Sequence, residues 1–239
     1  MKYAIISDLH ANLEAVETCF AEIENLRADR IICLGDLVDY CAQPIEVIQL
    51  VQDKCNAVVL GNHDEAQFNH PLSDRFNERA KISSIHTRSV LNPEIINYFR
   101  SLPLAHSESD LLFVHASPVD PPAYKYMLDE EAAVLNFPSF TEKICFIGHS
   151  HRPLLFESSA DGIKSAEEGR LDPAKRYIIN VGSVGQPRDN NPKLSFGFLD
   201  TELWDYRNIR VEYDTRSASE KIAKEGLPEF LASRIIEGI

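Results

Sequence analysis

The segment KYAIISDLH, residues 2–10, decides the fold, because an apolar run of strand length ends directly in two metal-competent side chains, Asp8 and His10. Four later segments repeat this arrangement. They read RIICLGD at 30–36, NAVVLGNH at 56–63, LLFVH at 111–115 and KICFIGHSH at 143–151. Continuous runs of Ile, Val, Leu and Phe are typical of strands that are buried on both faces. The chain is therefore expected to form an interior sheet with functional groups at its strand ends.

Helix-like segments separate the early strands. Asn12 can cap one helix, and Pro44 suits the first turn of a second. The apolar face of the first helix would carry Leu13, Val16, Phe20 and Ile23. A longer helix is expected over 74–91, and Asn92-Pro93 ends it. Another helix is expected from there to about Arg100. This alternation of strands and helices predicts an α/β fold.

The second half of the sequence is richer in strand-like segments. They are RPLLFES at 152–158, KRYIINVG at 175–182, LSFGFLD at 194–200 and NIRVEYD at 208–214. Helical composition returns from Ser217 onward. The stretch 116–142 contains four prolines and looks irregular, which favours a loop that faces the substrate.

The composition indicates one domain, 1–239, and limits the classes of molecule that the protein is expected to bind. No composition shift marks a second domain, and the formal net charge is −13. An extended nucleic-acid groove would need a basic face, so none is expected. Bound metal ions would attract an anionic substrate locally. A small phosphate-ester substrate is therefore the expected partner.

The cysteines and the hydropathy pattern predict a cytoplasmic protein. The five cysteines are odd in number and form no CxxC pair, as expected of reduced thiols. The apolar run before Asp8 is too short for a signal-peptide core, and no later stretch is long enough to cross a bilayer. No membrane partner is expected, and a homo-oligomer remains open.

Metal-competent side chains follow all five early strands. Open α/β sheets place their ligands at the carboxyl ends of strands. The candidates are Asp8, His10, Asp36, Asn62, His115, His149 and His151, with His63 beside them. Mixed imidazole, carboxylate and amide groups suit first-row transition metals, whereas a thiolate zinc site would need paired cysteines. A single DxH or HxH is more often a capped loop, and GNHD alone could be a Gly-Asn turn. The conjunction of all five favours a metal centre.

The order DLH, GDLVD, GNHD, VH and GHSH resembles the calcineurin-like metallophosphoesterase superfamily. NVGSVGQPRD at 180–189 and HASPVDPPAYKYML at 115–128 resemble its small single-domain phosphodiesterase branch from bacteria and archaea. The fold that this resemblance implies is an α/β four-layer sandwich of two mixed β-sheets flanked by α-helices. It also implies that the metals lie at one edge of the sandwich.

The resemblance implies two metal sites that share Asp36. The first would contain Asp8, His10, Asp36 and His151, and the second would contain Asp36, Asn62, His115 and His149. The cofactors would be two transition-metal ions, with Mn²⁺ favoured and Fe, Zn, Ni or Co as alternatives. Such a pair lowers the pKa of a shared water, and the bridging hydroxide then attacks phosphorus in line.

The resemblance also suggests roles for residues around the metals. His63 is expected to be the general acid, with Asp39 orienting it, although Asp39 could instead cap a helix. Asn62 is expected to contact the phosphoryl group as well as a metal. Arg188 would bind substrate phosphate, or else pin its loop through Asp189.

Two departures from the pattern bear on the substrate. Protein Ser/Thr phosphatases of the superfamily carry Arg and Glu where this chain has Tyr40 and Asp64. Without that arginine, the phosphodiesterase hypothesis is favoured. A protein Ser/Thr phosphatase and a dinucleoside polyphosphate hydrolase remain alternatives within enzymes. A non-catalytic metal-binding scaffold is a further alternative, which the intact Asn62-His63 disfavours.

Overall fold

The strand that delivers Asp8 lies inside the first of two sheets. In the computed structural model, which describes residues 1–239, this strand is β1 (Lys2–Ile6). The six strands are ordered β3 (Ala57–Val58), β2 (Arg30–Cys33), β1, β11 (Leu194–Asp200), β12 (Asp205–Val211) and β9 (Gly169–Arg170). β1, β2 and β3 run parallel, whereas β11, β12 and β9 add antiparallel pairs.

The second sheet is also mixed and also has six strands. Its order is β4 (Ala105–Glu108), β5 (Leu111–Val114), β6 (Ile144–Ile147), β10 (Arg176–Asn180), β7 (Leu154–Ser159) and β8 (Gly162–Ser165). β5, β6 and β10 run parallel, and the outer pairs are antiparallel. The parallel strands of both sheets are the ones that lead into the candidate site.

Alternate side chains of each central strand enter different apolar layers. Tyr3 and Ile5 of β1 pack between the two sheets, whereas Ala4 and Ile6 face the helices outside the first sheet. In the same way, Phe146 of β6 packs between the sheets and its neighbours face outward. This period of two explains why the strands read as continuous apolar runs, since both of their faces are buried.

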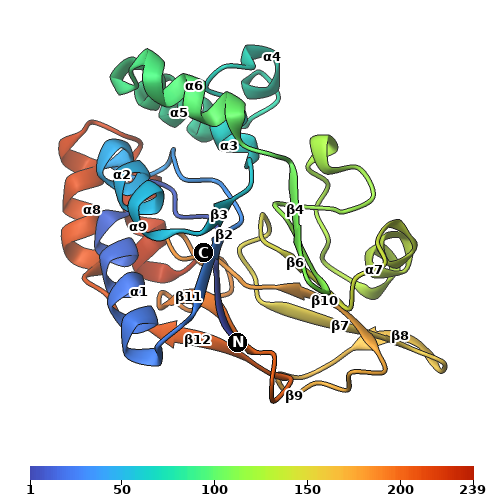
Figure 1. Cartoon of the computed structure of the whole chain (residues 1–239). Helices are drawn as coiled ribbons and strands as arrows, with labels where there is room; N and C mark the ends of the chain where they lie inside the picture. The colour runs from blue at the N-terminus through green and yellow to red at the C-terminus, as the bar shows by residue number, and fades with distance from the viewer.

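Helices cover the outer side of each sheet (Figure 1). On the first sheet lie α1 (Leu13–Leu26) and α2 (Pro44–Lys54), with α8 (Thr215–Lys224) and α9 (Glu229–Glu237) beside them. On the second sheet lies α7 (Glu130–Asn136). The result is the expected α/β sandwich of two mixed sheets flanked by helices, and the fold class is confirmed.

A third group of helices lies above the strand ends (Figure 1). It contains α3 (Asn62–Glu65), α4 (His70–Ser73), α5 (Glu78–Val90) and α6 (Pro93–Ser101). The single helix expected over 74–91 is wrong at its start, because Asp74 ends α4 and Asn77 caps α5. The Asn77 side chain accepts a hydrogen bond from Ala80 N at 3.1 Å, which sets the new start.

Three further expectations need correction. The stretch 116–142 is irregular only in part, since it contains α7 and the short 3₁₀ turns Pro121–Ala123 and Phe137–Ser139, whereas 124–129 forms no helix or strand. The strand expected over 56–61 is reduced to the two residues of β3. The edge strand β4 was missed, because its sequence AHSE is polar and half exposed. An edge strand has no second neighbour to bury it, so it needs no apolar pattern.

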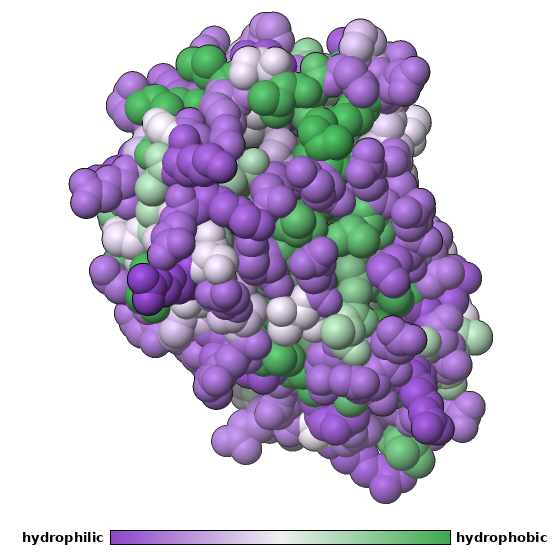
Figure 2. Space-filling view, turned by 90° about the vertical axis from the view of Figure 1, so that its left-hand side faces the viewer, coloured by the Kyte–Doolittle hydropathy of each residue, from purple (hydrophilic) through white to green (hydrophobic).

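The outer helices turn their polar sides to solvent. Figure 2 shows mostly hydrophilic side chains on this face of the molecule, with hydrophobic ones gathered toward its upper part. None of the helices combines the length and the apolar character that crossing a bilayer requires.

Candidate active site

The loops after β1 and β2 run side by side and carry the first ligands. Asp8 N donates to Gly35 O at 3.0 Å, and His10 N donates to Asp36 O at 3.0 Å, so the parallel pairing of the strands continues into the loops. The chain does not leave β1 in an extended conformation, because Asp8 and His10 both have left-handed backbones, with φ of 54° and 47°. Asp36, His149 and His151 are also left-handed.

This concentration of left-handed residues points to function. For residues other than glycine the conformation costs about 1–2 kcal/mol each. Such strain persists where the surrounding structure holds it, and it clusters at functional sites. Five of the seven predicted metal ligands therefore occupy backbone conformations that folding alone would not favour.

One side-chain cluster consists of Asp8, His10 and His151. All three side chains are buried, and their candidate ligand atoms lie within 4.8 Å of one another. His151 Nε2 lies 3.2 Å from Asp8 Oδ1 and 3.2 Å from His10 Nε2. The structure thus brings together residues that are 141 positions apart in the chain.

The second cluster consists of Asp36, His115 and His149, with Asn62 beside it. His115 Nε2 lies 3.3 Å from Asp36 Oδ2, 3.2 Å from His149 Nδ1 and 3.1 Å from Asn62 Oδ1. Asp36 Oδ2 also lies 3.7 Å from His10 Nε2 of the first cluster. Asp36 therefore stands between the two clusters, in the position predicted for a shared ligand.

Three backbone carbonyls set the tautomers of the histidines. His10 Nδ1 donates to Val38 O at 2.9 Å, His115 Nδ1 donates to Leu34 O at 2.8 Å, and His151 Nδ1 donates to Gln186 O at 2.6 Å. In the neutral ring this leaves each Nε2 as a lone pair directed into the clusters. Metal-binding histidines usually have such a partner behind the ring.

The buried charges of the clusters fit cations. Burial lowers the pKa of His149 to about 3 and that of His10 well below its usual range, so both rings stay neutral ligands. Burial alone would raise the pKa of Asp36, but the facing His115 and His63 outweigh it and hold the pKa well below its ordinary value. Asp36 is therefore an anion at neutral pH.

Two carboxylate oxygens lack any hydrogen-bond partner. They are Asp8 Oδ1 and Asp36 Oδ2, one in each cluster, and both are buried. An unpaired buried anion is expensive, and a bound metal ion removes the cost. Together with the mixed nitrogen and oxygen donors, these two oxygens show that the residues present fit a pair of first-row transition-metal ions.

Two glycines allow the loops to approach each other closely. A Cβ on Gly61 would lie 2.2 Å from the backbone N of Asp36, and a Cβ on Gly148 would lie 1.9 Å from Ser7 Oγ. Neither position has room for a side chain. The GN and GH steps of these two segments therefore serve the packing of the ligand loops.

His63 and Asp39 form the predicted pair. His63 Nδ1 donates to Asp39 Oδ2 at 2.7 Å, and the helix cap considered for Asp39 is wrong, because α2 begins after Gln43. Burial alone would lower the pKa of His63. The charge of Asp36 and the hydrogen bond to Asp39 outweigh this, so the pKa is raised above its ordinary value.

Arg188 lies beside the site, although not in the way the loop-pinning alternative required. Asp189 pairs with Arg210, not with Arg188. The Arg188 guanidinium donates to Gln186 Oε1 at 2.8 Å and lies 5.6 Å from the centre of the Tyr40 ring. The Arg188 guanidinium thus places a positive charge next to position 40, although position 40 itself is a tyrosine and not an arginine.

A cavity of about 290 Å³ opens beside the clusters. Its lining includes His63, Asn62, His149, Phe76 and Tyr126. Tyr126 is not a core residue, since 55% of it is exposed and its ring stacks on that of His149 at 4.2 Å.

Two further residues, which the sequence motifs do not reveal, support the site. Gln67 Nε2 donates to Asp39 Oδ1 at 3.1 Å and to His63 O at 2.9 Å, so it holds both members of the pair. Asp64 accepts from the backbone N–H groups of Asp36 and Leu37, each at 2.8 Å. The position of Gln67 four residues after His63 was the only signal that pointed to it.

Comparison with known proteins agrees with this geometry. The profile of the "Calcineurin-like phosphoesterase superfamily domain" matches residues 1–203. An uncharacterized protein of Methanocaldococcus jannaschii is 38% identical over 98% of this chain and 97% of its own length. The chain therefore belongs to the calcineurin-like phosphoesterase superfamily, and the resemblance inferred from the motifs is confirmed.

Solved structures support the same assignment. The crystal structure of a metallophosphoesterase from Sphaerobacter thermophilus is 37% identical, with a TM-score of 0.88, covering 100% of this chain and 99% of that one. A hypothetical protein from Pyrococcus horikoshii shares the fold at 21% identity and a TM-score of 0.82, covering 100% of this chain and 98% of that one.

Proposed function

We propose that this protein hydrolyses phosphodiester bonds in small substrates with the help of two metal ions, Mn²⁺ being the favoured one. The observation that carries the proposal is the pair of unpartnered carboxylate oxygens, Asp8 Oδ1 and Asp36 Oδ2, next to one cavity that also contains His63. Two bound metal ions would supply an activated water at neutral pH and neutralise charge on the phosphoryl oxygens.

His63 is the proton donor in this proposal. Its Nδ1–H donates to Asp39, so Nε2 is the nitrogen that would hold the proton that a leaving oxygen needs. Its raised pKa favours the protonated ring. Because Asp39 holds the ring from behind and Gln67 holds Asp39, the donor needs no reorientation during turnover.

Arg188 supplies a positive charge beside Tyr40, one of the residues that line the same cavity. Its place beside the Tyr40 ring supports the role of a fork donor to a substrate phosphate oxygen. Its two hydrogen bonds to Gln186 Oε1 would hold the guanidinium in position. Arg188 thereby takes the place of the arginine that protein phosphatases carry at position 40.

The size and walls of the cavity favour a small substrate. About 290 Å³ accommodates a phosphate with one organic group, and aromatic rings such as Tyr126 and Phe76 line it. A net charge of −13 opposes binding of a long polyanion. A phosphodiester with at least one small apolar or aromatic group satisfies both conditions.

The test is a comparison of three substrate types under defined metal loading. With Mn²⁺ the purified protein should cleave bis-p-nitrophenyl phosphate at least about tenfold faster than p-nitrophenyl phosphate or a phosphopeptide, and EDTA should abolish the reaction. Faster turnover of the phosphopeptide would favour a protein phosphatase. Inactivity on every substrate despite two bound metals per chain would favour the non-catalytic scaffold.

A further inference from the structure

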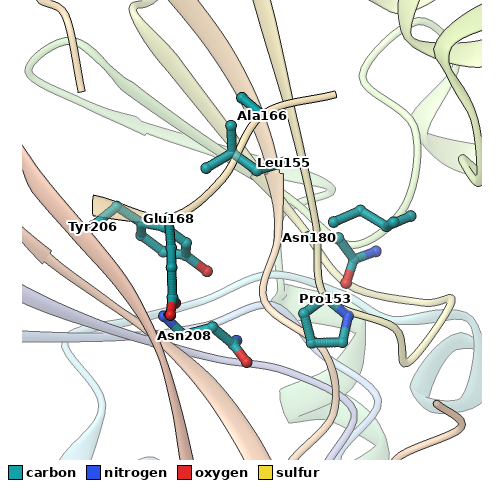
Figure 3. Close-up of a pocket in the computed structure, with 8 residues that line it drawn as sticks. Pro153, Leu155, Ala166, Glu168, Asn180, Tyr206 and Asn208 are labelled. Carbon is teal, nitrogen blue, oxygen red and sulfur yellow. The ribbon is translucent and has the colours of Figure 1, made fainter. Parts of the chain in front are cut away.

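A second cavity lies away from the metal clusters, among strands of both sheets. Its volume is about 180 Å³, and its walls come from β7, β10, β12 and the segment between β8 and β9. Figure 3 shows the apolar side chains of Pro153, Leu155 and Ala166 around it, with Tyr206 and Glu168 among them. None of these residues belongs to the active site described above.

Tyr206 is the first sign that this cavity holds a ligand. The residue is 2% exposed, and its hydroxyl has no hydrogen-bond partner. Figure 3 shows the hydroxyl oxygen directed into the cavity. Burial raises the pKa of Tyr206, so the hydroxyl stays neutral and can both donate and accept. A buried hydroxyl without a partner costs free energy that a polar ligand group would recover.

Glu168 is the second sign, and it sets the charge of the ligand. Its carboxylate accepts one hydrogen bond, from the backbone N–H of Asn208 at 2.6 Å, and forms no salt bridge. The nearby Arg210 does not neutralise it, because Arg210 is already paired with Asp189. The cavity therefore has one uncompensated negative charge, which disfavours phosphate esters and favours a cation.

We propose that this cavity binds a small organic cation that carries a hydroxyl or similar polar group at the far end of a short apolar chain. The ammonium group pairs with Glu168, the chain packs between Leu155 and Ala166, and the polar end bonds to the Tyr206 hydroxyl. A net charge of −13 concentrates such cations around the protein. The ligand is chemically unlike the anionic substrate of the active site.

Asn180 connects the cavity to the loop that carries His149. This side chain lines the cavity, and its amide donates to Gly148 O at 2.6 Å and to Ser150 Oγ at 2.9 Å. Gly148 and Ser150 flank His149, so the ligand would lie directly behind the loop that supplies ligands to both clusters. The two sites are nevertheless separate, since they open to different cavities.

Binding of 5-amino-1-pentanol tests the proposal without any assay of activity. Calorimetric titration of the full chain should give one site with a Kd of about 1 mM, as expected for so small a ligand. Pentylamine, which lacks the hydroxyl, and 1-pentanol, which lacks the ammonium, should each bind more weakly. The proposal would be overturned if 5-amino-1-pentanol failed to bind at a concentration about 50-fold above the expected Kd.

Three variants distinguish binding in the cavity from non-specific attraction of cations to the acidic protein. Glu168→Gln should weaken binding at least about tenfold, and Tyr206→Phe about threefold. Neither should unfold the protein, because Glu168 is exposed and the Tyr206 hydroxyl makes no bond. Glu167→Gln removes the same charge next to the cavity without lining it and should bind normally. Equal loss in Glu167→Gln, or unchanged binding in both cavity variants, would refute the site.

Discussion

At the scale of single residues, His63 is distinguished from the other site histidines by its partner. Its Nδ1–H donates a hydrogen bond to the carboxylate of Asp39. The Nδ1–H groups of His10, His115 and His151 donate to backbone carbonyls instead. A carboxylate partner stabilises the charged ring, whereas a carbonyl partner fixes the proton on Nδ1 and directs Nε2 into the clusters. The same side chain is therefore prepared for proton transfer at one position and for metal binding at the others.

The first prediction concerns the variant His63→Ala. It should retain both metals, because His63 belongs to neither cluster, and lose about 10²- to 10⁴-fold in kcat. Metal content by elemental analysis and kcat on a phosphodiester measure the two effects.

The leaving group provides the control for this variant. A good leaving group such as p-nitrophenolate needs little protonation, so the loss should be smaller for it than for an alkyl or phenyl ester. If the loss were the same for all leaving groups, His63 would have a role other than general acid.

At the scale of elements, the edge strand β4 links the two sheets through one carboxylate. Glu108 accepts hydrogen bonds from Tyr3 of β1 at 2.8 Å and from Arg30 of β2 at 2.7 Å. Burial alone would raise the pKa of Glu108. The hydrogen bonds from Tyr3 and Arg30 outweigh this and lower the pKa below its ordinary 4.5. This polar contact joins an otherwise exposed strand to the opposite sheet.

The variant Glu108→Gln should therefore be less stable by about 1–3 kcal/mol at pH 7. A carboxyl with a lowered folded-state pKa stabilises the protein above its unfolded pKa, and the contribution disappears as the pH falls through the folded pKa. The difference from wild type in urea unfolding should thus shrink below about pH 4. The exposed Glu131→Gln should show no comparable pH-dependent loss.

The C-terminal helices are an element that the family profile does not reach. The profile ends at residue 203. Nevertheless, α8 and α9 pack against Tyr40 and Cys41, the two residues that follow Asp39 in the chain. Ile235 of α9 is fully buried in this cluster, while its neighbour Ile236 is 49% exposed. The two adjacent isoleucines therefore provide a buried test position and an exposed control position.

Ile235→Ala should cost about 2–5 kcal/mol, since it leaves a cavity in the cluster, whereas Ile236→Ala should change stability by less than about 0.5 kcal/mol. The urea midpoint at constant m-value measures both. Equal effects would mean that α9 does not pack as described.

At the scale of the whole molecule, the metal clusters join the two sheets. Asp8 and Asp36 follow strands of the first sheet, and His115 and His149 follow strands of the second. Metal ions that bind these ligands would bind the folded chain and not the unfolded one. They would also remove the cost of the two unpartnered carboxylate oxygens.

Mn²⁺ should therefore raise the Tm, and EDTA should reverse the rise. Each site contributes about 2.7 kcal/mol when the free metal is 100-fold above its Kd. Asp36→Asn should abolish most of the rise and all turnover, because Asp36 stands between both clusters. The exposed Asp161→Asn should keep the full rise. An undiminished rise in Asp36→Asn would place the stabilising metal elsewhere.

Much of this molecule could be predicted from local sequence. Central strands that are buried on both faces leave a continuous apolar signal, so β1, β2, β5, β6, β10 and β11 were predicted close to their observed bounds. The polar strand β4 and the break before α5 were not, because an exposed edge and a cap such as Asn77 leave weak signals. The ligand residue types were likewise readable, since each follows its strand directly.

By itself the sequence determined the class of fold and the seven candidate ligands, because these depend on residue type and on short spacing, whereas the His63–Asp39 pair followed from the family resemblance. Tertiary structure decided how these residues meet in space, and it places His151 beside Asp8 and His149 beside Asp36, as the family resemblance implied. It also decided that Arg188 lies over Tyr40 and that Tyr206 faces a cavity. The physical reason is that these contacts join segments far apart in the chain, and left-handed turns aim the side chains only once both sheets have packed.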